Sequence, residues 1–219
     1  MKHFTVYHLK TRLALAALGA ALVSHAQQPA APAPVTAQVK IKTMPKPDKV
    51  TVQTPEFQFR GVTPRSLSRG KPREWAVIDV DYETKSQTKW TDTVTATFYV
   101  MAETMGADRQ KEFSLYTLTV RYVNVPDGDH RAGVVLAPST LERFGNVVAI
   151  ACEITADGAP VPVVMNENMA RELNAYKDDW WKNPKILDAP ITKKRDGLLL
   201  ERSKTPFALI NIDDYEAVR

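Results

Sequence analysis

The sequence is poor in residues that build metal sites and disulfide frameworks, because its 219 residues include one cysteine and four histidines. A single cysteine cannot form an internal disulfide or a zinc knuckle. His3, His8 and His25 lie in the N-terminal leader, so the rest of the chain keeps only His130. The 44% apolar and 25% charged residues are typical of a globular protein and exclude wholesale disorder, collagen and a multi-span membrane protein.

Residues 1–26 are typical of a signal peptide. Lys2, Lys10 and Arg12 form a basic start, and the uncharged run Leu13–Val23 follows. This run is too short for a membrane-spanning helix, which needs roughly 20 apolar residues. Small residues at positions 24 and 26 predict cleavage after Ala26 and export of the chain. The alternative is a retained N-terminal anchor helix.

The leader also carries most of the excess positive charge. Without its three cations the chain has 26 basic and 25 acidic residues, a net charge of +1. A nucleic-acid partner is therefore not expected, since such partners need a concentrated basic face. Residues 27–38 are rich in Pro and Ala and lack charge, which predicts an extended tether. Residues 39–219 are then expected to form one domain.

Apolar residues recur with a period of two along this domain, which predicts β-strands. The inward stripes are Ala76-Ile78-Val80-Tyr82, Val94-Ala96-Phe98-Val100, Tyr116-Leu118-Val120-Tyr122 and Val148-Ile150-Cys152-Ile154. Shorter strands are predicted at Val39–Thr43, Lys49–Gln53, His130–Ala137, Val161–Met165, Gly197–Arg202 and Phe207–Ile212. Hairpin turns are expected at Pro126–Asp129 and at Asp157-Gly158. Because no βαβ alternation is present, the pattern predicts two antiparallel sheets packed face to face.

Two helices interrupt the strands. The first is predicted over Pro138–Phe144, with Ser139 and Glu142 at the spacing of a capping box. The second is predicted over Asn166–Lys182, where apolar residues recur at helical spacing, and Asn183-Pro184 is expected to end it. This longer helix would cover one end of the sandwich.

No catalytic or metal-binding motif accompanies the strands. His130 follows a predicted turn and is interpreted as a surface histidine, and no G-x-S-x-G nucleophile elbow is present. Cys152 lies on an apolar stripe and is expected in the core. The acidic groups at 127–129, 178–179 and 213–214 lack the spacing of a calcium loop, so no metal and no cofactor are expected. An exported hydrolase using Asp79, Asp81 or other carboxylates remains a third hypothesis.

Two features could bind a partner. Trp180 and Trp181 are adjacent and cannot both face inward from a regular helix, so Trp181 is expected to be partly exposed. They either plug the end of the sandwich or stack against sugar rings. Residues 60–73 form a basic, loop-like stretch that could attract an acidic partner, a lipid phosphate or a charged glycan. The candidate binding residues are Trp180, Trp181, Arg65, Arg69, Lys71 and Arg73.

The segments Trp180-Trp181-Lys182-Asn183-Pro184 and Arg202–Ala208, with Asp213–Glu216 near the C-terminus, resemble a known group of proteins. These are small exported immunoglobulin-like proteins found beside type IV pilus genes in mucin-degrading Verrucomicrobia. The resemblance implies a non-enzymatic envelope protein linked to pilus or secretin machinery. Pilin subunits match poorly, because they begin with a long apolar helix.

The sequence therefore predicts an all-β, immunoglobulin-like antiparallel β-sandwich with one short and one longer peripheral helix. Its expected function is protein binding and assembly at the bacterial envelope, in the periplasm, at the outer membrane or on the cell surface. Strand pairing at Val39–Thr43 or at Phe207–Ile212 is the expected mechanism. Envelope or pilus-assembly proteins are the expected partners, and self-association into a homo-oligomer is an alternative that the sequence leaves open. The alternative function is a cell-surface module that binds host or mucin glycans.

Overall fold

The computed structural model describes residues 37–54, 73–157, 159–160, 164–165, 180–209 and 216–217. The chain divides into two units, residues 1–33 and residues 34–219, and every described residue lies in the second. The predicted signal peptide lies outside the described residues, as does the predicted tether up to residue 36. Gln38, the last residue of that tether, already belongs to the first strand.

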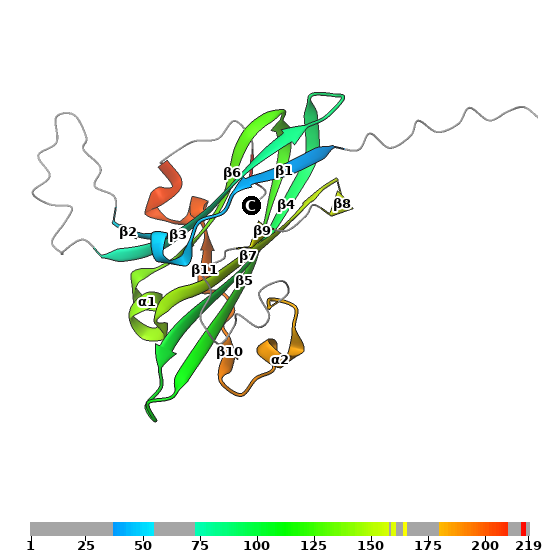
Figure 1. Ribbon diagram of the computed structural model, residues 1–219. Coiled ribbons are helices and arrows are strands. Elements are labelled where there is room, and N and C mark those ends of the chain that lie inside the picture. Colours follow the sequence, from blue (N-terminus) through cyan, green and yellow to red (C-terminus); the bar gives the residue numbers. More distant parts are fainter. Residues whose placement is uncertain are drawn as a thin grey trace, which may run out of the picture. The chain divides into compact units, whose positions relative to one another are not determined.

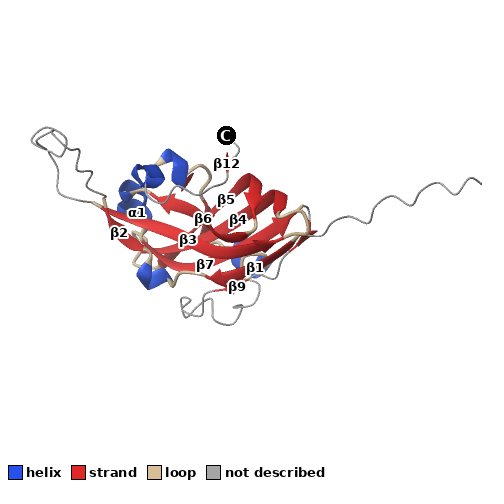
Figure 2. Ribbon diagram, turned by 90° about the horizontal axis from the view of Figure 1, so that it is seen from above, coloured by secondary structure: helices blue, strands red, loops and turns tan. Residues whose placement is uncertain are grey.

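Two sheets form the domain, and the predicted all-β sandwich is confirmed (Figures 1 and 2). The five-stranded sheet has the order β1-β3-β6-β11, and β2 also pairs with β3. Its strands are β1 (Gln38–Thr43), β2 (Thr51–Gln53), β3 (Glu74–Lys85), β6 (Gly128–Leu136) and β11 (Leu199–Glu201). A 3-10 helix, η1 (Pro47–Lys49), lies between β1 and β2.

The seven-stranded sheet has the order β10-β5-β4-β7-β8, with β12 on β5 and β9 on β7. All its pairs are antiparallel except β10 with β5, which is parallel. Its strands are β4 (Trp90–Met105), β5 (Lys111–Pro126), β7 (Asn146–Ala156), β8 (Ala159–Pro160), β9 (Val164–Met165), β10 (Thr192–Lys194) and β12 (Glu216–Ala217).

The period-two stripes line the interface between the sheets. Buried side chains from β3, β4, β5, β6 and β7 form the main core. Ile78, Phe98 and Ile150 have no exposed surface, and neither does Cys152. The predicted inward stripes are therefore confirmed, apart from Val148, which packs on the other face of its sheet after a register shift opposite Met101 and Ala102. Burial raises the pKa of the Cys152 thiol, so this cysteine remains a neutral core residue.

The turn at residues 126–129 is not a hairpin, which corrects the prediction. β5 belongs to the seven-stranded sheet and β6 to the five-stranded sheet, so the chain crosses between the layers at Asp127. Gly128 has φ +132°, a conformation that side-chain-bearing residues rarely adopt. The connection from β3 to β4 crosses at the same corner, where Ser86 N donates to Asp127 Oδ1 at 2.7 Å.

Helix α1 (Pro138–Phe144) connects β6 to β7, as predicted, but without a capping box. Its N-cap is Ala137, and Pro138 occupies the first helical position. Ser139 therefore lies inside the first turn, where its side chain cannot cap. Proline at this position supplies the helical φ and removes an N–H that would have no partner.

The predicted longer helix is not present where its end is described. Residues 166–179 lie outside the described residues, and residues 180–182 form a turn. Asn183-Pro184 begins a helix instead of ending one. Asn183 is the N-cap of α2 (Pro184–Leu187), and its side chain accepts a hydrogen bond from Lys185 N at 3.0 Å.

The segment that follows β11 contacts the five-stranded sheet, before β12 pairs with β5 of the other sheet. After β11 the chain forms two 3-10 helices, η4 (Arg202–Lys204) and η5 (Pro206–Leu209). The strand predicted from Phe207 is therefore wrong over residues 207–209, and residues 210–212 lie outside the described residues. Phe207 is buried and packs edge-on against Trp75, with 5.6 Å between ring centroids.

Candidate functional site on the outer face of the five-stranded sheet

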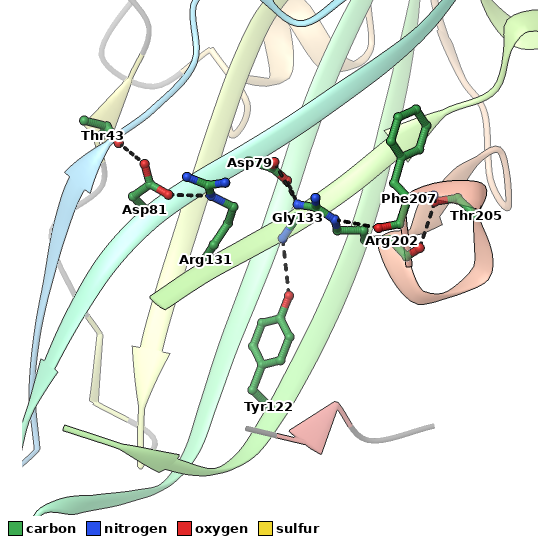
Figure 3. A network of polar contacts seen from close by, with 9 residues as sticks. All are labelled: Thr43, Asp79, Asp81, Tyr122, Arg131, Gly133, Arg202, Thr205 and Phe207. Carbon is green, nitrogen blue, oxygen red and sulfur yellow. Dashed lines mark hydrogen bonds and ion pairs between the residues drawn. The ribbon is translucent and has the colours of Figure 1, made fainter. Parts of the chain in front are cut away.

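The outer face of the five-stranded sheet carries a network of charged side chains (Figure 3). Alternation places Asp79 and Asp81 of β3 outward, because Ile78, Val80 and Tyr82 point into the core. Arg131 on the neighbouring β6 pairs in register with Asp81. Arg202 joins from η4. The network therefore unites two central strands with the C-terminal segment.

Arg202 holds both carboxylate oxygens of Asp79. Its Nη1 donates to Oδ1 at 2.9 Å and to Oδ2 at 2.8 Å, and its Nε donates to the Phe207 carbonyl at 3.3 Å. Both side chains are largely buried, at 23% exposure for Asp79 and 17% for Arg202. Burial raises the pKa of Asp79, and the charges of Arg202 and Arg131 offset this only in part.

A glycine makes room for this ion pair. Gly133 lies beside Asp79 in the β3–β6 register. A Cβ atom at this position would lie 2.3 Å from Asp79 Oδ1 and 3.6 Å from the Arg202 Cδ. Gly133 N donates to the Tyr122 hydroxyl of the opposite sheet at 3.3 Å. Gly133 thus leaves space for the ion pair on one side and donates a hydrogen bond to the opposite sheet.

Asp81 is held in a second arrangement. Arg131 Nε donates to Oδ1 at 2.6 Å, and the Thr43 hydroxyl donates to Oδ2 at 2.6 Å. Partial burial acts to raise its pKa, but the hydrogen bonds from Arg131 and Thr43 outweigh it and hold the pKa of Asp81 below its usual value. Both aspartates of the hydrolase hypothesis are therefore bound by cationic or hydroxyl donors.

A hollow of about 610 Å³ lies beside this network at the edge of the sheet. Lys42 lies at its rim and forms ion pairs with Asp129 and Glu83. The hydrogen bond to Asp129 raises the pKa of Lys42. The hollow is lined by Lys42, Thr43, Asp81, Tyr82, Asp129, His130 and Arg131. Acidic and basic groups alternate around it, so it has no uniform charge.

His130 is buried, which corrects its interpretation as a surface histidine. It is 8% exposed, and its ring lies 5.5 Å from that of Tyr82. Its Nε2 lies 2.6 Å from the Pro126 carbonyl and 3.0 Å from the Thr84 hydroxyl. His130 lies opposite Tyr82 in the β3–β6 register, on the face of the sheet that points into the core. The imidazole thus connects the ends of β3 and β5 at the point where the chain enters β6.

A second polar cluster lies on the outer face of the seven-stranded sheet and was not predicted. Glu153 accepts hydrogen bonds from Trp181 Nε1 at 3.1 Å and from the Tyr99 hydroxyl at 3.2 Å, and it forms an ion pair with Lys182. Partial burial acts to raise the pKa of Glu153, but the hydrogen bonds from Lys182 and Trp181 dominate and lower it. Burial, and then the Glu153 charge, raise the pKa of Tyr99 to about 12.

Trp180 and Trp181 are both buried, at 0% and 6% exposure, so the predicted exposure of Trp181 is wrong. Because residues 180–182 form a turn rather than a helix, successive side chains can both face the sheet. Their rings meet edge to face at 6.1 Å and pack in a separate apolar cluster with Phe113. Trp90, at 51% exposure, is instead the tryptophan that presents its ring to solvent.

The basic stretch is described only at its end. Arg65, Arg69 and Lys71 lie outside the described residues. Arg73 forms an ion pair with Glu142 of α1 at 2.7 Å, and its backbone pairs with Thr54. Of the predicted binding residues, Trp180 and Trp181 are in contact with each other over the seven-stranded sheet. Arg73 directly precedes β3 of the five-stranded sheet. Binding by any of them stays a prediction.

The described residues include neither a metal-binding cluster nor a helix that could span a membrane. They contain no group of three histidine, cysteine, aspartate or glutamate side chains placed to hold a metal ion. Within the same ranges, no helix has the length and apolar content needed to cross a bilayer.

Comparison with known proteins places the fold among solved structures. A crystal structure of a protein from Akkermansia muciniphila, a mucin-degrading Verrucomicrobium, is similar to this chain with a TM-score of 0.65 and 23% identity. The match covers 85% of this chain and 95% of that chain, and it shows a common fold. No curated protein matches the sequence. One protein-family model matches residues 33–219, and the chain belongs to that family.

Proposed function

We propose that this chain is a non-enzymatic, exported protein of the bacterial envelope that acts through protein–protein contacts in assembly. The observation that carries the proposal is that Asp79 and Asp81 are held by side chains of the same chain. Both oxygens of Asp79 and of Asp81 accept hydrogen bonds from side chains of the same chain. Such carboxylates stabilise the sheet and are poorly placed to act as a general acid or base on a substrate.

Association with type IV pilus or secretin machinery is the finer part of the proposal. Its support is the resemblance at residues 180–184 and 202–208, together with a structural relative from Akkermansia muciniphila. The same resemblance supports an immunoglobulin-like type of sandwich. Both segments are structural in this chain, because residues 180–184 cover one sheet and Arg202 ties the C-terminal segment to the other.

The test is crosslinking in the native envelope. A photoreactive residue would be placed at exposed Lys40, at exposed Lys185 on the other side of the domain, and at buried Ile150 as a control. We expect pilus-assembly or secretin components to be crosslinked from an exposed position and not from the buried one. Recovery of the same proteins from all three positions, or of none, would contradict the proposal.

A second candidate function, glycan binding, is favoured by one observation. Trp90 is 51% exposed at the start of β4, next to Pro126 of β5. An exposed tryptophan can stack on the apolar face of a sugar ring. A mucin-glycan array probed with the wild type and with Trp90→Ala would test this function. Saturable binding that Trp90→Ala removes would favour the adhesin, and an array without signal would contradict it.

A further inference from the structure

We propose that the basic edge formed by residues 38–53 binds an extended acidic segment of a partner protein, which adds to β1 as a new strand. The inference rests on the proposed function, because it names the surface and the chemistry of the partner. The basic edge is made of β1, η1 and β2, which all lie on the same side of β3.

β1 is the longest of the described strands that end a sheet order. It has six residues and ends the order of its sheet. The other strands at sheet ends, β2, β8, β9, β10, β11 and β12, have three residues or fewer. Short edges give an incoming strand few hydrogen bonds. Half of the backbone groups of β1 point away from β3 and can pair with a strand laid alongside.

The opposite edge of this sheet is closed by the chain itself. β11 ends at Glu201, and Arg202 then turns into η4 and binds Asp79. The Gly133 N–H on β6 donates to Tyr122 at the point where β11 has ended. Beyond the end of β11, η4 contacts β6, so an added strand would have to displace η4 there. On the β1 side, no strand of the described residues pairs with the edge that faces away from β3.

The charge of the edge selects the partner. Residues 38–53 contain four lysines, Lys40, Lys42, Lys46 and Lys49, against the single acid Asp48. All four are exposed. Without its leader the chain is nearly neutral, so this concentration is local. An acidic strand would complement it, whereas two copies of the same edge would bring lysines together, which disfavours β1–β1 pairing.

The local geometry also fits a selective edge. The register shifts between Ile41 and Thr43, so Lys42 occupies an irregular position and turns toward Asp129 and Glu83. Bulges and edge lysines protect natural sheets from indiscriminate pairing. Lys49 Nζ lies 4.0 Å from Asp48 Oδ2, so Lys40 and Lys46 are the edge lysines for which no ion pair is found among the described residues. The same residues therefore hinder neutral strands and favour acidic ones.

The probe is a capped peptide of about ten residues in which Glu alternates with Thr or Val, a length that spans the edge. We expect saturable binding to the full domain, weakened tenfold or more by Lys40→Glu and weakened at higher salt. Lys185→Glu on α2 makes the same charge change on the cover of the other sheet and should leave binding within twofold. Lys46→Glu is the second edge variant in case Lys40→Glu, which faces Glu83 across the pair, unfolds.

Control peptides separate strand addition from simple charge attraction. Two isomers carry N-methyl groups on alternate residues, one on each edge of the peptide. Strand addition predicts that one isomer loses binding and the other keeps it. Equal binding of both isomers, or of a proline-interrupted peptide with the same number of Glu residues, would overturn the inference. Binding of heparin without binding of the peptide would also overturn it and indicate an anionic polysaccharide.

The test also separates this inference from the proposed function. If a photoreactive residue at exposed Lys46 crosslinks assembly proteins equally with Lys40 intact and with Lys40→Glu, the edge inference fails while the proposed function stands. If Lys40→Glu instead abolishes self-association seen by sedimentation, the occupant is a second copy and the inference is wrong. Absence of any crosslinked assembly protein contradicts the proposed function, whatever the peptide result.

Discussion

The outer faces of the two sheets each receive a returning segment of the chain, and they hold it with different forces. On the seven-stranded sheet, Trp180, Trp181 and Ile186 pack on Phe113 and Leu115 as an apolar cluster. On the five-stranded sheet, Arg202 binds the Asp79 carboxylate beside Gly133. The first contact depends on apolar area and the second on the geometry of a charged pair.

This difference indicates how each face responds to change. When a substitution removes part of an apolar cluster, the free energy of unfolding falls in proportion to the cavity volume that is left. A buried ion pair is sensitive to the loss of one partner, since the remaining charge stays uncompensated in a site of low polarity. Substitutions that remove either buried apolar area or one charge of the ion pair would therefore test this difference between the two faces.

The largest effect is expected at Trp180, which has no exposed surface. Trp180→Ala should lower the free energy of unfolding by about 4 kcal/mol, because it removes a large buried ring and leaves a cavity. Trp90→Ala is the matched control, since Trp90 is 51% exposed, and it should change stability by about 0.5 kcal/mol or less. Urea unfolding at neutral pH measures both. Equal losses in the two variants would contradict the apolar cover.

A smaller effect is expected for Gly133→Ala on the other face. The new Cβ would lie 2.3 Å from Asp79 Oδ1, so the carboxylate must move away from Arg202. We expect a loss of about 2 to 3 kcal/mol, the cost of disturbing a buried pair.

The double variant with Asp79→Asn provides the check for Gly133→Ala. If the clash with the carboxylate is the cause, the two substitutions should be strongly non-additive in urea unfolding. Additive losses would show that Gly133 matters for another reason, such as its backbone hydrogen bond to Tyr122.

The strands and core could be predicted because burial imposes a direct period of two on the sequence. Ile78, Phe98 and Ile150 lie where alternation placed them. The sheet membership of the strands could not be predicted, since Pro126–Asp129 has the composition of a hairpin turn and yet carries the chain between layers. Local turn chemistry fixes the bend and says nothing about which strands pair.

The candidate site escaped prediction for a related reason. Asp79 and Arg202 are 123 residues apart, and Glu153 lies 28 residues from Trp181. No spacing rule connects residues at such distances. The outward parity that Asp79 shares with Asp81 on β3 was the available signal, because a charge on a sheet face that another segment covers needs a partner. The Asn183-Pro184 pair misled because asparagine followed by proline suits both ends of a helix.

The stability contributions of Glu153 on one face and of Asp79 on the other should depend on pH with opposite signs. Hydrogen bonds lower the pKa of Glu153, so its stabilising contribution is present above the unfolded value of about 4.3 and is lost as pH falls through the folded value. Glu153→Gln should therefore cost about 1 kcal/mol at pH 7, and the difference from wild type should shrink by pH 3. Urea unfolding at both pH values measures this difference.

Asp79 supplies the contrasting case. Burial raises its pKa in the folded state, so its contribution is present at low pH and is lost as pH rises through the folded value. Asp79→Asn carries a neutral side chain at every pH, so wild type should lose stability relative to this variant as pH rises, whereas wild type gains stability relative to Glu153→Gln as pH rises. The same trend in both variants would show that the two carboxylates do not differ in the direction of their pKa shifts.

The smallest effect is expected for Arg73, whose ion pair with Glu142 is exposed, at 52% and 66% of the two side chains. Arg73→Gln should change the free energy of unfolding by about 0.5 kcal/mol or less, because solvent screens such pairs. Arg202→Gln, which leaves Asp79 without its partner, should cost about 3 kcal/mol and serves as the comparison. If Arg73→Gln were as damaging as Arg202→Gln, burial would not be what distinguishes these arginines. A small stability change would leave Arg73 available to be tested for partner binding without a folding defect.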